Sequence, residues 1–93
     1  MYQNPEVESS YRENNLGKTL YDQVIEHKPK TIVEFGCLYG YSTIAMAMAL
    51  RDLGQGMIYC YDLWEEYDFK HSTLDETMEN LKRYDLLDFV EFK

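Results

Sequence analysis

Apolar residues recur at four-residue steps near the start of the chain, at Leu16, Leu20 and Val24. This spacing places the side chains on one face of a helix, and it predicts a helix over residues 16–27. Pro29 ends that helix, because the residue before a proline is disfavoured in the helical conformation. Asn14 or Asn15 is expected to cap its first turn.

Further along the chain, short apolar runs alternate with longer helical patterns. The runs predict β-strands at residues 31–35, 57–61 and 89–92. The helical patterns predict helices over residues 42–53 and from the capping box Thr73–Glu76 to about Arg83. Alternating strands and helices indicate an α/β fold with parallel strands. We therefore expect one α/β domain over residues 14–93, preceded by a flexible N-terminal arm at residues 1–13.

The composition restricts the possible partners. Of the 93 residues, 45% are hydrophobic and 28% charged, as in an ordinary globular domain, and the net charge is −8. An acidic chain repels the phosphate backbone, so we expect no nucleic-acid partner. No apolar run reaches the roughly 20 residues of a membrane-spanning helix, and the N-terminus lacks the pattern of a signal peptide. We expect no membrane partner and a cytoplasmic location.

Two glycines, Gly36 and Gly40, lie where the first strand gives way to a helix. Glycine permits a positive φ there and lets a ligand approach the backbone, while the following helix N-terminus presents N–H groups to an anion. The spacing is G-x-x-x-G, without the middle glycine that admits a pyrophosphate in dinucleotide-binding enzymes. A smaller anion, such as an amino-acid carboxylate, fits this loop better. The spacing therefore argues against a nicotinamide-dependent oxidoreductase.

Asp62 stands at the end of the second strand, about 20 residues after the glycine loop. An acidic residue at this distance accepts hydrogen bonds from ribose hydroxyls. Together, the loop and the aspartate predict a site for a nucleoside that carries a carboxylate. S-adenosylmethionine has that shape.

The run from Ile32 to Thr43, which reads I-V-E-F-G-C-L-Y-G-Y-S-T, resembles motif I of the class I S-adenosylmethionine-dependent methyltransferases. It is especially similar to the small-molecule O-methyltransferases related to catechol O-methyltransferase, which show an apolar strand and then E-x-G-x-x-x-G-Y-S. The resemblance covers about residues 14–93. It implies a three-layer α/β/α Rossmann-like sheet with strands in the order 3-2-1, incomplete relative to the seven strands of the family. It also implies S-adenosylmethionine as cofactor and a small molecule as methyl acceptor.

The same resemblance implies roles for individual residues. Gly36 and Gly40 would pass the backbone along the methionine moiety, and Glu34 would orient the loop or meet the ammonium group. The residues near the methionine carboxylate would be Tyr39, Tyr41 and Ser42. Asp62 would accept the ribose hydroxyls, and the residues flanking the adenine would be Leu63 and Trp64.

Structural explanations stay open for some of these residues. Ser42 also fits a helix N-cap, Asp62 a solvated strand end, and Trp64 a core or lid residue. The acidic cluster that begins at Asp62 matches no calcium-loop spacing. Cys37 and Cys60 have no metal or redox spacing, so we expect reduced, inert thiols and no metal site.

The function has two main alternatives. In the related family a fourth strand carries the acidic residue that faces the substrate, and no such strand follows residues 89–92, so we name no catalytic residue. The chain would be the cofactor-binding half of a methyltransferase or a non-catalytic nucleoside-binding or assembly module. Without a fourth strand beside it, the strand at residues 31–35 would be an exposed apolar edge, and such edges recruit partners. We therefore expect either that the chain is a fragment of a longer protein or that it forms a homodimer through this edge.

Overall fold

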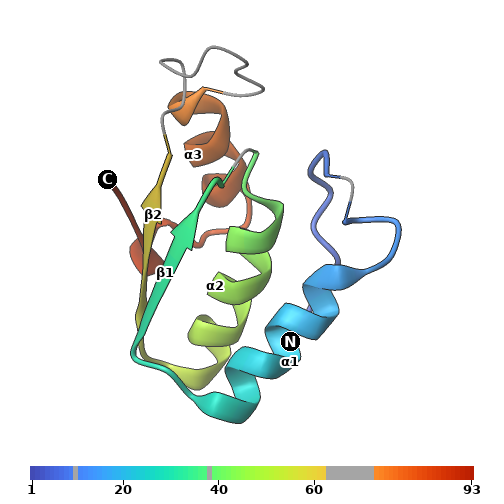
Figure 1. Cartoon of the computed structure of the whole chain (residues 1–93), viewed down its shortest axis with the longest axis vertical. Coiled ribbons are helices and arrows are strands. Elements are labelled where there is room, and N and C mark those ends of the chain that lie inside the picture. The colour runs from blue at the N-terminus through green and yellow to red at the C-terminus, as the bar shows by residue number, and fades with distance from the viewer. Residues whose placement is uncertain (10, 38, 63–72) are drawn as a thin grey trace.

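The computed structural model describes residues 1–9, 11–37, 39–62 and 73–93, in which helices and strands alternate (Figure 1). The helices are α1 (Leu16–His27), α2 (Tyr41–Leu53) and α3 (Leu74–Arg83), and the strands are β1 (Thr31–Phe35), β2 (Met57–Tyr61) and β3 (Val90–Phe92). These bounds agree closely with the predicted elements. The third strand begins one residue later than predicted, because Phe89 completes a 3₁₀ turn over Leu87–Phe89. Within the described ranges, no helix has the length and hydropathy that a bilayer crossing requires.

The strands form a parallel sheet in the order β1-β2-β3, which confirms the predicted order 3-2-1. In the register of β1 and β2, Glu34 lies opposite Cys60, and Phe35 lies opposite Tyr61. Parallel strands end at the same edge of their sheet. This topology therefore brings the glycine loop, which follows β1, next to Asp62, which follows β2.

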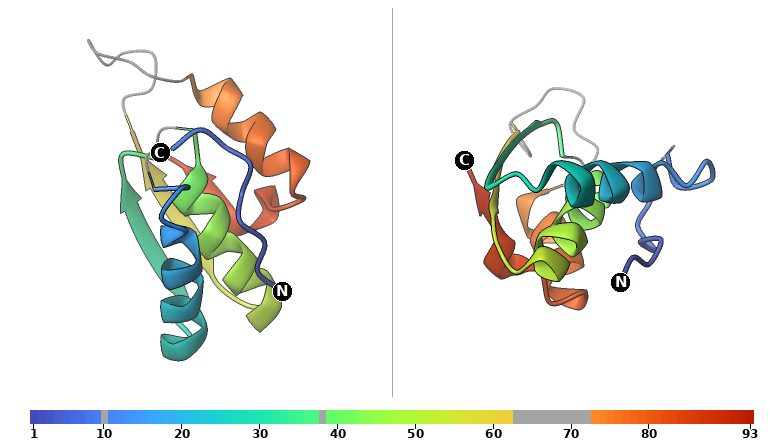
Figure 2. Two further views of the ribbon diagram at one scale, coloured as in Figure 1. Left: turned by 90° about the vertical axis from the view of Figure 1, so that its right-hand side faces the viewer. Right: turned by 90° about the horizontal axis from the view of Figure 1, so that it is seen from below.

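The helices gather on one face of the sheet in both views of Figure 2. The central helix is α2, whose side chains Ile44, Ala47 and Leu50 are fully buried. The described residues thus form two layers of the predicted α/β/α arrangement, as a partial Rossmann-like fold. The other face of the sheet carries Val33, which is 53% exposed, and Phe35, which is 78% exposed.

Two helix starts show different capping. Asn15 occupies the N-cap position of α1 but has a left-handed φ of 52°, and its side chain does not cap the helix as predicted. Its amide oxygen instead accepts a hydrogen bond from the Tyr2 hydroxyl at 3.2 Å. The predicted capping box of α3 is confirmed, because the Thr73 hydroxyl accepts from the Glu76 N–H at 3.1 Å and the Glu76 carboxylate accepts from the Thr73 N–H at 3.3 Å.

Residues 1–9, which the sequence assigns to a flexible arm, run along the helical layer (Figure 2). Pro5 and Val7 are buried. The N–H of Glu6 donates to the Tyr84 hydroxyl at 2.8 Å, which connects this segment to the end of α3. The segment therefore packs as part of the helical layer.

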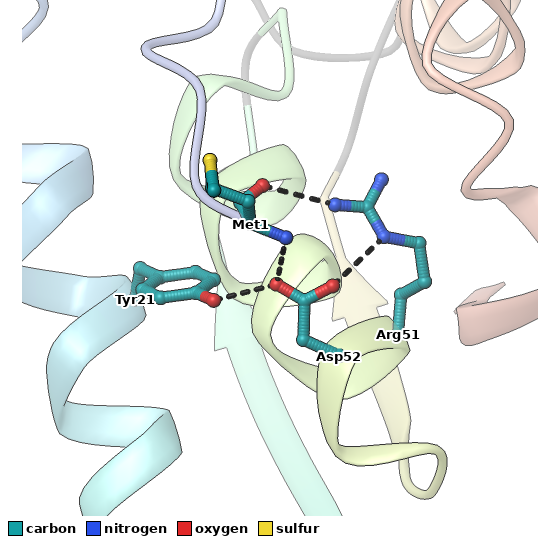
Figure 3. Close-up of polar contacts among 4 residues, drawn as sticks. All are labelled: Met1, Tyr21, Arg51 and Asp52. Carbon is teal, nitrogen blue, oxygen red and sulfur yellow. Dashed lines mark hydrogen bonds and ion pairs between the residues drawn. The ribbon is translucent and has the colours of Figure 1, made fainter.

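Figure 3 shows the polar contacts at the start of this segment. The Met1 ammonium and the Tyr21 hydroxyl each donate to the Asp52 carboxylate at 2.5 Å, and the Arg51 guanidinium donates to the Met1 carbonyl at 3.1 Å. Burial alone raises the pKa of Asp52, but the hydrogen bonds from the Met1 ammonium, Tyr21 and Arg51 outweigh it and lower this pKa. The hydrogen bond from the Tyr21 hydroxyl to Asp52, together with burial, raises the pKa of Tyr21 to about 12. These contacts join α1 to α2.

Candidate functional site

The loop between β1 and α2 turns at two glycines with positive φ, 77° at Gly36 and 95° at Gly40. The Gly36 N–H donates to the Tyr61 carbonyl at 3.0 Å, and the Gly40 N–H donates to the Cys37 carbonyl at 2.9 Å. A Cβ at Gly40 would lie 3.2 Å from the methyl group of Thr77, whereas a Cβ at Gly36 would meet nothing within 4 Å. The backbone conformation thus favours glycine at both positions, and packing adds to this only at Gly40.

Asp62 lies beside this loop. Its Oδ2 accepts a hydrogen bond from the backbone N–H of Cys37 at 2.8 Å. The end of β2 therefore contacts the glycine loop through the Asp62 carboxylate and through the carbonyl of Tyr61. A carboxylate has room for several hydrogen bonds, so the bond to Cys37 is compatible with ribose hydroxyls as further donors.

Glu34 connects β1 to the first turn of α2. One carboxylate oxygen accepts a hydrogen bond from the Ser42 hydroxyl, and the other accepts one from the Thr43 hydroxyl. Thr43 is fully buried, and Cys60 also donates to Glu34, at 3.8 Å. These contacts join the end of β1 and the middle of the sheet to the start of α2.

The first turn of α2 has neither a capping side chain nor an acidic residue of its own. Gly40 occupies its N-cap position and has no side chain to cap the helix, and the turn contains no acidic residue. The N–H groups at such a terminus carry a partial positive charge. The alternative interpretation of Ser42 as the N-cap is wrong, because Ser42 lies inside the helix and its hydroxyl binds Glu34.

The two tyrosines of the motif contact neighbouring elements. The carbonyl of Tyr39 accepts a hydrogen bond from the Asn80 side chain of α3 at 2.9 Å. The ring of Tyr41 is buried, and its hydroxyl accepts from the Gly17 N–H at 3.0 Å and donates to Asn4 at 2.8 Å. The side chain of Tyr41 is therefore directed at α1 and the N-terminal segment, where it supports the loop.

Sequence reasoning missed Thr43 and Asn80 as loop contacts. Thr43 gave a local signal, since it stands beside Ser42 in the first turn of the helix. Asn80 gave none, because 41 residues separate it from Tyr39. The predicted adenine-flanking residues, Leu63 and Trp64, lie outside the described residues.

A second cluster lies beneath the loop, where Glu34 is grouped with the two buried thiols Cys37 and Cys60. The Cys60 Sγ also lies 3.9 Å from the Thr43 hydroxyl. The hydrogen bond with Cys60, burial and the charge of Glu34 raise the pKa of the Cys37 thiol well above its usual range. The Cys37 thiol therefore lies in an environment that favours its protonated form.

The parallel sheet, with its helices on one face, places the chain in the class of Rossmann-like α/β domains. The sequence profile of a family described as "Methyltransferase domain" matches residues 33–92, well over half of the chain. The chain therefore belongs to this methyltransferase family. No curated protein matches it.

Solved structures give the same assignment. A candidate O-methyltransferase from Klebsiella pneumoniae is 30% identical, with a TM-score of 0.69, and the match covers 85% of this chain and 32% of that protein. The SAH-bound methyltransferase PaMTH1 from Podospora anserina is 28% identical, with a TM-score of 0.66 and coverage of 92% and 32%. The cofactor-bound protein Rv0187 from MTB is 26% identical, with a TM-score of 0.69 and coverage of 98% and 37%. The chain thus spans about a third of the length of these proteins.

Proposed function

We propose that this chain binds S-adenosylmethionine as the cofactor-binding half of an O-methyltransferase that acts on a small molecule. The observation that carries the proposal is the hydrogen bond from the Cys37 N–H to Asp62. It brings a candidate ribose acceptor into direct contact with a glycine loop that has the methyltransferase spacing. The SAH bound to the Podospora protein and the O-methyltransferase description of the Klebsiella protein support the choice of cofactor and reaction class.

The methionine end of the cofactor would lie along the loop. Gly36 and Gly40 have no side chains to obstruct it, and the N–H groups at the start of α2 would bind its carboxylate. Tyr39, Tyr41 and Ser42 would lie beside that carboxylate, Tyr41 and Ser42 through their backbone N–H groups, because their side chains bind Asn4 and Glu34. Glu34 would act indirectly, because its carboxylate accepts the hydroxyl of Ser42 and so fixes the first turn of the helix.

The nucleoside end would lie at the tip of β2. Asp62 would accept the ribose hydroxyls while its bond to Cys37 keeps the loop beside the ribose. Leu63 and Trp64 would flank the adenine. When bound, S-adenosylmethionine carries an activated methyl group, and the residues of the chain orient that group toward the acceptor.

Calorimetric titration tests this proposal. We expect one molecule of S-adenosylhomocysteine or S-adenosylmethionine to bind per chain, and no binding of NAD⁺, whose pyrophosphate does not suit the G-x-x-x-G loop. Absence of binding by both sulfur ligands would contradict the proposal. Binding of S-adenosylmethionine without its conversion, in the presence of catechol-type acceptors, would favour the non-catalytic nucleoside-binding module instead.

We also propose that the chain forms a homodimer through β1. In the described sheet, β1 has β2 on one side and its outer edge open. Next to that edge, the exposed ring of Phe35 stacks on Tyr61 with 5.4 Å between ring centroids, and Val33 is also exposed. An exposed apolar edge strand pairs readily with another strand.

Light scattering after size exclusion tests the dimer. We expect the wild-type mass of two chains to fall to one chain in Val33→Lys, because a charge on the edge strand opposes pairing. Tyr11→Ser, at a residue that is 51% exposed on another part of the surface, should leave the dimer unchanged. A wild-type mass of one chain at millimolar concentration would contradict the homodimer.

The location that we propose is the cytoplasm. Cys37 and Cys60 are both free thiols, as is usual for proteins of a reducing compartment. Fractionation of cells that produce the tagged chain tests the location, with the soluble cytoplasmic fraction as the expected place and a secreted or membrane fraction as the contradicting result.

A further inference from the structure

Glu34, Cys37 and Cys60 bring three metal-binding atoms together from three segments of the chain. One carboxylate oxygen and the two sulfurs all lie within 4.8 Å of one another. Glu34 and Cys60 are register partners on β1 and β2, and Cys37 belongs to the loop that follows β1. Both cysteines are almost fully buried, at 2% and 0% exposure.

The donor atoms favour a thiophilic cation over magnesium or calcium. Two thiols and one carboxylate form a mixed sulfur and oxygen set, which zinc accepts and which hard cations do not prefer. In a tetrahedral zinc site, bonds of about 2.3 Å to sulfur and 2.0 Å to oxygen place the two ligands roughly 3.5 Å apart. The Cys60 Sγ and the Glu34 Oε1 are separated by 3.8 Å, so a small shift would give this geometry.

A fourth ligand, the hydroxyl oxygen of Thr43, lies close to this set. The Thr43 hydroxyl is 3.9 Å from the Cys60 Sγ and is hydrogen-bonded to the same carboxylate oxygen of Glu34. It can fix a water molecule or contribute its own oxygen. Among the described contacts of the Glu34 carboxylate, all three partners are uncharged hydroxyls or thiols, so a cation would bring the neutralising charge.

We propose that Glu34, Cys37 and Cys60 bind a thiophilic divalent cation of the zinc class beneath the glycine loop. On binding, the metal forms bonds to both sulfurs and to a carboxylate oxygen, and the two thiol protons pass to solvent. The site links β1, the loop and β2 and does not depend on the proposed methyltransferase activity. It differs from the sequence expectation because the two cysteines are far apart in sequence and become neighbours only in the folded sheet.

Cobalt(II) is the probe for this site, because thiolate ligands give it an intense near-ultraviolet charge-transfer band. We expect one Co²⁺ per chain with this band and its loss on addition of Zn²⁺. Cys37→Ser and Cys60→Ser should each lower the affinity at least tenfold and weaken the band, and Glu34→Gln should lower the affinity with the band retained. His27→Ala removes another potential metal ligand, on the exposed end of α1, and should change neither the affinity for Co²⁺ nor the band.

Two results would overturn the proposal. One is a wild-type titration without a charge-transfer band up to millimolar Co²⁺, and this result needs no variant. The other is an unchanged band in the Cys37→Ser, Cys60→Ser double variant, which would place the metal elsewhere. Circular dichroism identifies any variant that fails to fold, and Zn²⁺ should raise the melting temperature of the wild type but not of the folded double variant. Titration of S-adenosylhomocysteine in the presence of a chelator tests the proposed function separately.

Discussion

The carboxylate of Asp62 accepts a hydrogen bond from the backbone N–H of Cys37 at 2.8 Å, across 25 residues of sequence. This bond joins the end of β2 to the glycine loop that follows β1. Under our proposal, the Asp62 carboxylate therefore has two roles: it holds the glycine loop and it accepts hydrogen bonds from the ribose. Changes at Asp62 should affect both the loop and the cofactor.

Asp62→Ala should weaken binding of S-adenosylhomocysteine at least tenfold, about 1.4 kcal/mol, because it removes the proposed ribose acceptor and the loop contact. Titration calorimetry of the folded variant measures the loss. Asp88→Ala removes an exposed carboxylate from the 3₁₀ turn and serves as the matched control. Equal affinities of the two variants would contradict the role of Asp62.

Gly40→Ala should destabilise the chain more than Gly36→Ala. Both substitutions put a side chain on a residue with positive φ, which costs roughly 1–2 kcal/mol. Only at Gly40 does the new methyl group also press on Thr77, at 3.2 Å. Urea unfolding of the two variants gives the comparison, and a larger loss for Gly36→Ala would show that packing by Thr77 is unimportant.

Tyr41→Phe should lower the free energy of unfolding by about 1–3 kcal/mol, the usual cost of an unsatisfied buried donor. The hydroxyl that it removes accepts from the buried Gly17 N–H and donates to Asn4. Tyr11→Phe removes a hydroxyl from an exposed tyrosine and should change stability by less than about 0.5 kcal/mol. The account of Tyr41 fails if the two variants are equally stable.

The Tyr21 hydroxyl predicts a pH dependence on the alkaline side. Its pKa is raised to about 12 in the folded chain by the hydrogen bond to Asp52, against about 10 in the unfolded chain. A raised pKa stabilises the fold below pH 10, and this contribution is lost as the pH rises from 10 toward 12. Wild type should therefore exceed Tyr21→Phe in stability at pH 8, with the difference shrinking above pH 10. A difference that stays constant across this range would contradict the assigned hydrogen bond.

The acidic partner of Tyr21 has the opposite dependence. The lowered pKa of Asp52 means that its contribution is present above its unfolded pKa of about 3.9 and is lost as the pH falls through the folded value. Asp52→Asn should cost roughly 1 kcal/mol at pH 7 and much less at pH 3. Urea unfolding at both pH values measures the change, and an equal cost at both would contradict it.

The elements and their order could be predicted from the sequence because each gives a local signal. The apolar run of β1, the four-residue stripe of α1 and the Thr73–Glu76 box lie within single segments. When strands and helices alternate, the strands pair in parallel, and the right-handed crossovers between them allow few arrangements of the sheet. The glycine spacing and the position of Asp62 identified the loop and its neighbour for the same reason.

The contacts that support the loop could not be predicted, because they form between distant segments. The bonds from Tyr41 to Asn4 and from Asn80 to Tyr39 depend on how helices pack. The grouping of Cys37 with Cys60 depends on the register of β1 against β2. The prediction that Asn15 caps α1 with its side chain was wrong, because Asn15 has a left-handed conformation and N-cap residues usually have an extended one.

The central claim is that the glycine loop and Asp62 together bind S-adenosylmethionine. Two-dimensional ¹H–¹⁵N NMR of the labelled chain tests it most directly, by titration with S-adenosylhomocysteine. The account predicts that the amide signals of Gly36, Gly40 and Asp62 shift in a saturable way, while that of Asp88 does not. Unchanged signals at Gly36, Gly40 and Asp62 at saturating ligand would contradict it.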